Sequence, residues 1–139
     1  MAVTATPVFA QAVNLGLITI VNADGQTYKT AFTAGSNGSI ITSIIVSSND
    51  TSNRDITINV TRSAVNYQMT QVSIPLSAGT SNSVPCVNIL NNAQFPGLEY
   101  DASGNKILRL KSGDTLTVNA PVTVTAAKTI TIFTSGEDL

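Results

Sequence analysis

The sequence predicts an all-β protein, a single-domain antiparallel β-sandwich or barrel of jelly-roll-like form with an extended N-terminal arm. Several short segments alternate apolar and polar residues with a period of two. Turn-forming residues separate them, and no apolar stripe of helical period exceeds two turns. The 139 residues match the size of one domain. We therefore expect an arm over residues 1–14 and a sandwich over residues 15–139.

The clearest strand is "RDITINVTR", residues 54–62, which places Ile56, Ile58 and Val60 on one face. Before it, "SIITSIIV" (residues 39–46) is apolar without a break, which is typical of a strand buried on both faces. The polar "SSNDTSN" (47–53) separates the two. We expect residues 33–62 to form a hairpin whose apolar faces enter the core.

Three later segments also alternate and are expected to be strands: "AVNYQM" (64–69), "DTLTVNA" (114–120) and "AAKTITIFT" (126–134). Turn sequences such as "NADGQ", "DASGNK" and "KSGDT" lie between the strands. "NNAQFPGLEY" (91–100) has no clear period and is expected to be a long loop. Strands separated by such turns favour an antiparallel sandwich or barrel.

The few aromatic residues and the single cysteine divide between core and loop. Tyr28, Phe32 and Phe133 lie in strand patterns and are expected in the core. Phe95 and Tyr100 lie in the long loop, where they either anchor that loop on its own domain or contact a partner. Cys86 has no partner for an intrachain disulfide and is expected to be buried as a small apolar residue.

Composition indicates a protein that packs against copies of itself or against a larger partner. Charged residues are 11% of the chain, against about 25% in an average domain, and Ser, Thr and Asn make up about a third of it. The net charge is −1 and the basic residues are scattered, so no nucleic acid partner is expected. No apolar run approaches the ~18 residues of a membrane span, so no membrane partner is expected. The N-terminus lacks the charged start of a signal peptide.

The sequence offers little material for catalysis. It contains no histidine, which removes the commonest general base and metal ligand. Most acidic residues fall in predicted turns, where aspartate bonds the nearby backbone. Asp101, Ser103 and Asn105 are spaced like calcium-loop residues, but the further acidic ligands are missing, so a hairpin loop is favoured. We expect no enzymatic activity, no catalytic residue, no cofactor and no metal site.

Three stretches together resemble a family of small structural proteins of tailed bacteriophages, encoded near the major capsid protein. They are residues 32–62, 84–118 and 124–139, with "AGSNGS", "NDTSNRD", "PGLEYDASGNKILRLKSGDTL" and "TAAKTITI" as the most similar pieces. The resemblance implies an all-β virion protein without enzymatic activity that decorates the capsid exterior. It also implies that the major capsid protein is the partner and that the chain is made in the bacterial host cytoplasm.

Apolar side chains in the arm and in the long loop are the predicted contacts with that partner. They are Val3, Val8, Phe9, Phe95, Leu98 and Tyr100. We also expect a small homo-oligomer, a dimer or a trimer. Two alternatives stay open: a neck, tail or baseplate component of the virion, and a carbohydrate-binding adhesive sandwich.

Overall fold

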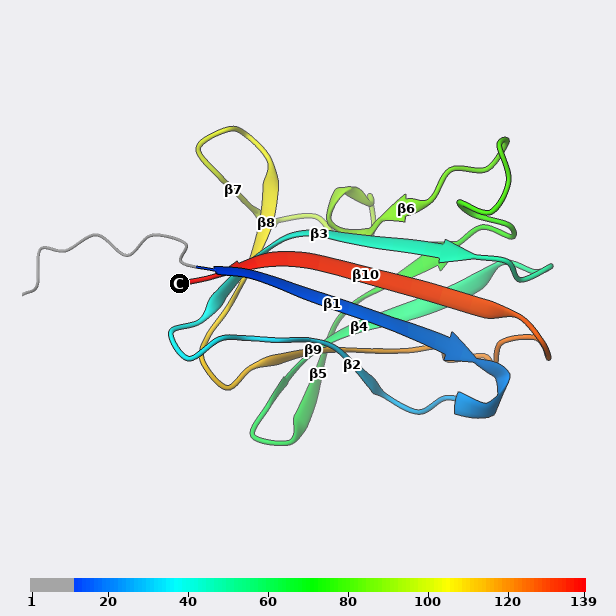
Figure 1. The fold of residues 1–139 in the computed structure, drawn as a ribbon, viewed down its shortest axis with the longest axis horizontal. Helices are drawn as coiled ribbons and strands as arrows, with labels where there is room; N and C mark the ends of the chain where they lie inside the picture. Colours follow the sequence, from blue (N-terminus) through cyan, green and yellow to red (C-terminus); the bar gives the residue numbers. More distant parts are fainter. Residues whose placement is uncertain (1–11) are drawn as a thin grey trace, which may run out of the picture.

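The computed structural model describes residues 12–139, which form two antiparallel sheets packed face to face (Figure 1). Sheet A contains, in order, β1 (Ala12–Val21), β10 (Thr129–Asp138), β3 (Ser39–Ser48), β8 (Lys106–Leu110) and β7 (Glu99–Tyr100), with β6 (Val87–Asn88) on β3. Sheet B contains β2 (Lys29–Thr33), β9 (Thr115–Asn119), β4 (Arg54–Arg62) and β5 (Val65–Ile74). Two 3₁₀ turns are η1 (Asn22–Asp24) and η2 (Ile89–Asn91). The predicted all-β class is confirmed, and the sheets form a sandwich rather than a barrel.

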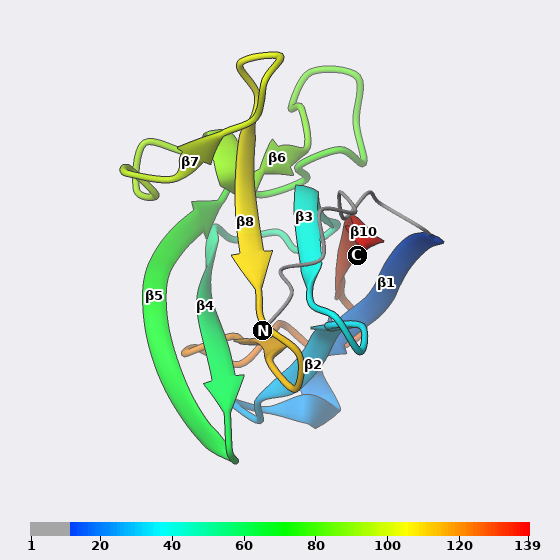
Figure 2. The ribbon, with the colours of Figure 1, turned by 90° about the vertical axis from the view of Figure 1, so that its left-hand side faces the viewer.

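The strand order is that of a jelly roll. The long strands pair in a nested series, β1 with β10, β2 with β9, β3 with β8 and β4 with β5. Folding this series over once gives the two sheet orders β1-β10-β3-β8 and β2-β9-β4-β5. Figure 2 shows the two layers from one end. Among these eight strands, only the β4–β5 connection stays within one sheet.

The expected hairpin over residues 33–62 is wrong in its pairing. Both strands and the polar break exist, but β3 lies in sheet A and β4 in sheet B. Their apolar faces meet across the core instead of side by side, because alternation specifies which face is buried and not which strand lies alongside. The outer face of β3 is also not fully buried, since Ile40 and Ile45 are half-buried.

Aliphatic side chains from both sheets make one core. Ile41, Ile44 and Val46 of β3 are fully buried, as are Ile56 and Ile58 of β4. Burying each such side chain contributes roughly 1.5–3 kcal/mol.

Three residues expected to be buried are not. Phe32 is in the core, but Tyr28 and Phe133 are exposed, and so is Cys86. Phe133 follows the buried Ile132 in a regular strand, so it points to the opposite face.

The sandwich begins earlier than the expected boundary after residue 14. β1 starts at Ala12, and its pairing with β10 runs from Ala12 opposite Asp138 to Val21 opposite Thr129. The last three residues of the predicted arm are therefore part of a sheet A edge strand. The remainder of the arm, residues 1–11, lies outside the described residues.

Candidate interaction surfaces

The most deeply buried carboxylate, Asp50, joins two connections that cross between the sheets. It lies between β3 and β4, and its oxygens accept hydrogen bonds from the Ser52 N–H, from Arg54 (2.9 Å) and from Thr125, which lies between β9 and β10. Burial alone would raise the pKa of Asp50, but the hydrogen bonds from Thr125, Arg54 and Ser52 outweigh it and hold that pKa well below its usual value. Asp50 therefore holds the β3–β4 connection against the β9–β10 connection.

Two further aspartates tie the opposite end of the sandwich. Asp114 forms two hydrogen bonds of 2.6 and 2.7 Å with Arg62, which lower its pKa. Asp138 accepts a hydrogen bond from the Ser39 hydroxyl (2.5 Å) and one from the Asn14 amide (2.8 Å), and both lower its pKa. The predicted use of aspartates in turns is confirmed for Asp50 and Asp114, which accept hydrogen bonds from the nearby backbone N–H groups of Ser52 and Lys111. Asp138 differs, because it lies in β10 and bonds side chains of β1 and β3.

These depressed pKa values predict how folding stability changes with pH. A carboxyl whose pKa is lower in the folded state adds stability above its unfolded pKa of about 3.9 and loses it as pH falls through the folded value. We expect the thermal midpoint to be flat between about pH 6 and 8, where no histidine titrates, and to fall steadily below about pH 4. Calorimetry over this range checks it, and a midpoint that drops between pH 6 and 8 would contradict it.

The structure also bears on metals and membranes. Within residues 12–139, no three His, Cys, Asp or Glu side chains are grouped so that they could hold a metal ion. Asp101 accepts hydrogen bonds from the N–H groups of Ser103 and Asn105, in the hairpin loop between β7 and β8. No helix in this part of the chain has the length and apolar character to cross a membrane.

The outer face of sheet A is apolar where it approaches the β1 edge. Val13, Leu15 and Leu17 point outward from β1, and Leu17 is 68% exposed. Leu17 pairs with Phe133 of β10, which in turn pairs with Ile45 of β3, so the apolar row crosses three strands that lie side by side in Figure 1. We call these five residues the outer apolar face.

Neighbouring outward positions carry almost no charge. The flanking rows consist of Thr19, Thr131 and Ser47 on one side and Ser135 and Ser43 on the other. Glu137, at the end of β10, is the one charged side chain that points outward from β1, β10 and β3 within the described residues.

The outer face of sheet B has a different character. Its central positions are polar and nearly covered, with Thr57 opposite Asn119 and Asn59 opposite Thr117. The alternation of apolar side chains inside and polar side chains outside is typical of antiparallel sheets. Sheet A departs from it, since Val13, Leu15, Leu17 and Phe133 are exposed on its outer face, and an exposed apolar patch is characteristic of a binding surface.

The long loop places its three predicted contact residues differently. Phe95 is 5% exposed and packs in the core, so it takes the first of its two expected roles, that of anchoring the loop. Leu98 packs partly against the same core. Tyr100, in β7, is 65% exposed and is free to contact a partner. The predicted contacts Val3, Val8 and Phe9 lie outside the described residues.

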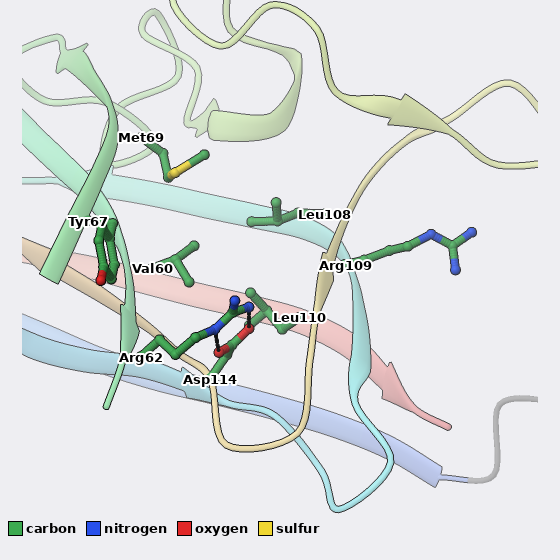
Figure 3. A pocket seen from close by; sticks show the side chains of 8 residues that line it. All are labelled: Val60, Arg62, Tyr67, Met69, Leu108, Arg109, Leu110 and Asp114. Atoms are coloured by element: carbon green, nitrogen blue, oxygen red, sulfur yellow. Dashed lines mark hydrogen bonds and ion pairs between the residues drawn. The ribbon is translucent and has the colours of Figure 1, made fainter. Parts of the chain in front are cut away.

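A hollow of about 360 Å³ opens between β5 and β8 at the inner side of the sandwich (Figure 3). Its apolar lining comes from Val60, Tyr67, Met69, Leu108 and Leu110. Its charged lining residues are neutralised: Arg62 is bonded to Asp114, and Arg109 is bonded to Glu99 at 2.7 Å. In the figure, Arg109 points away from the space that the apolar side chains share.

Sequence reasoning missed both apolar surfaces. Residues 12–21 were not recognised as a strand, because their second half, "LITIV", is apolar at nearly every position and hides the alternation of Val13, Leu15 and Leu17. The hollow joins residues from three separate strands, β4, β5 and β8, which no local pattern connects.

The fold and surfaces define the class of this protein as a jelly-roll sandwich with an exposed apolar sheet face. No protein family model matches the chain. No curated protein matches it either. One solved structure with similarity to this chain is a chain of the "Cyanophage Pam1 capsid asymmetric unit", with 15% sequence identity and a TM-score of 0.45. The similarity covers 99% of this chain and 94% of that one.

Proposed function

We propose that the protein is a non-enzymatic virion structural protein that decorates the outer surface of a tailed-phage head, with the major capsid protein as its partner. The observation that carries the proposal is the outer apolar face. An enzyme needs a site that concentrates reactive groups, whereas a decoration protein needs a broad adhesive surface. The choice of the capsid as the partner of this surface rests on a resemblance to small phage structural proteins, found in residues 32–62, 84–118 and 124–139.

The chemistry of this face suits attachment at many identical sites. Leucine and valine side chains on it gain free energy when they leave water, at about 25 cal/mol per Å². The surrounding Ser and Thr hydroxyls cost far less to desolvate than charged groups. The face therefore binds a matching apolar patch without needing paired charges at each site.

The arm and the loop extend the proposed contact area beyond this face. Val3, Val8 and Phe9 are proposed arm contacts, and Tyr100 is the proposed loop contact because its ring is exposed. Phe95 and Leu98 hold the loop in place from beneath. We also propose that the bound form is a small homo-oligomer, a dimer or a trimer, whose symmetry follows that of the head position it occupies.

The test is to mix the purified protein with heads that lack it, sediment the particles and count bound copies. We expect occupancy to saturate at many copies per head, at a number dictated by the head lattice. Saturation at the few copies of one vertex would instead support a neck, tail or baseplate component. No binding by the folded protein would overturn the capsid proposal, and a glycan array would then test the adhesive alternative.

A single substitution tests whether the outer apolar face makes the contact. Leu17→Asp places a charge on that face, and burying an unpaired ion costs several kcal/mol. We expect the affinity for heads to fall about 100-fold or more while the thermal midpoint stays near that of the wild type.

The matched control is Gln68→Asp, which adds the same charge at an exposed position on β5 of sheet B. It should bind heads as the wild type does. Equal occupancy for both variants would show that the sheet A face is not the contact surface.

A further inference from the structure

We propose that the hollow between β5 and β8 is a docking site for the N-terminal segment of the same chain, residues 1–11, with Val3 as the side chain that enters it. The proposal concerns the free protein and stands whether or not the protein binds heads.

The hollow exposes apolar groups that nothing in the described structure covers. Tyr67 and Met69 are 54% and 50% exposed, yet together with the neighbouring Val60 they face Leu108 of β8 across the hollow (Figure 3). Tyr67 is the cross-strand partner of Val60, so both point to the inner side of sheet B. A concave apolar lining of this kind contacts a bound side chain on several sides at once.

The hollow has an apolar lining and charged residues that already have counter-charges. Arg62 is bonded to both oxygens of Asp114, and Arg109 is bonded to Glu99, so an uncharged occupant leaves both ion pairs intact. Residues 1–11, "MAVTATPVFAQ", contain no Asp, Glu, Lys or Arg side chain. The segment is rich in small and apolar residues, and Met69 is a flexible, adaptable partner for them.

The segment starts close enough to reach the hollow. Ala12 is paired with Asp138, Asp138 with Ser39, and Ser39 with Leu110, which lines the hollow. These three steps between adjacent strands amount to about 14 Å. Val3 is nine residues before Ala12 and, in extended chain, reaches about 30 Å.

Val8 and Phe9 lie too near Ala12 to enter the hollow deeply, at about 10–13 Å of extended chain. Because the segment is tethered, its effective concentration at the hollow is in the millimolar range, and a weak intrinsic affinity suffices.

Disulfide trapping tests the placement. In a Cys86→Ser background, Val3→Cys is combined with Met69→Cys, whose side chain faces the hollow, or with Gln68→Cys, the neighbouring exposed residue that pairs with Asn59 on the outer face of sheet B. We expect the Met69 pair to form an intrachain disulfide about tenfold faster than the Gln68 pair. Equal rates, or a disulfide that joins two chains, would overturn the proposal.

Hydrogen exchange gives a second readout without cysteines. In the full chain, the amides of residues 65–69 should exchange about tenfold more slowly than in the Val3→Asp variant, which puts a charge in the segment. Residues 70–74 of the same strand serve as the internal control and should not change, because Val72 and Ile74 already lie in the core. The same exchange at residues 65–69 in both proteins would count against docking.

Discussion

Asp50→Ala should lower the free energy of unfolding by about 3–5 kcal/mol at neutral pH. The substitution removes the acceptor for the N–H groups of Ser52 and Thr125 and leaves the Arg54 guanidinium without its counter-charge. The side chain of Arg54 is only 15% exposed, so water does not replace the lost partner. For a domain of this size, with a total stability of about 5–15 kcal/mol, the loss is a large fraction.

Urea denaturation measures this effect, and Asp55→Ala supplies the matched control. Asp55, at the start of β4, accepts one exposed hydrogen bond from Gln71 and is not part of the Asp50 network. Its removal should cost about 0.5 kcal/mol or less. If the two variants unfold at the same urea concentration, Asp50 does not tie the sheets as the geometry indicates.

Gly16→Ala should destabilise the protein by about 3 kcal/mol, at the upper end of the cost of overpacking. A Cβ atom on Gly16 would lie 1.9 Å from the carbonyl oxygen of Ala31, because β2 passes directly beneath β1 at this point. Neither backbone can move aside easily, since β1 is paired along its whole length with β10 and Ala31 is buried beside Phe32. In a position without this contact, glycine to alanine would instead stabilise by about 0.4–1 kcal/mol.

A urea titration therefore shows whether Gly16 contacts Ala31. The free energy of unfolding falls in the Gly16→Ala variant if the contact exists and rises if it does not. Leu17→Ala, at the adjacent and exposed position, is the control and should change stability by about 0.5 kcal/mol or less. A neutral or stabilising Gly16→Ala would mean that β1 and β2 do not approach this closely. Because β1 carries three residues of the outer apolar face, such a result would also alter the proposed contact surface.

Local patterns predicted the strands whose two faces differ in polarity. In β4, Ile56 and Ile58 alternate with Thr57 and Asn59, and the structure buries the isoleucines in the core. In β10 the same alternation places Phe133 with Thr131, on the face opposite Ile132. The prediction that Phe133 is buried is wrong, because strand alternation turns its ring to the face opposite the buried Ile132.

The candidate surfaces could be predicted from the sequence less completely than the strands. Tyr100 and Phe95 were recognised as loop aromatics, but only the packing of Phe95 into the core separates their roles. Leu15 and Leu17 lie in a segment with apolar residues on both faces, so periodicity does not say which of them are covered.

The sequence by itself determined the all-β class, the inward residues of the alternating strands and the use of aspartates in turns. These are local properties, because strand periodicity and the reach of a short side chain extend over only a few residues. Only the tertiary structure decided that β3 and β4 lie in opposite sheets, that Asp50 meets Thr125, and that an apolar row crosses β1, β10 and β3. Each of these depends on strands distant in the chain becoming neighbours, and many pairings satisfy the same local pattern equally well.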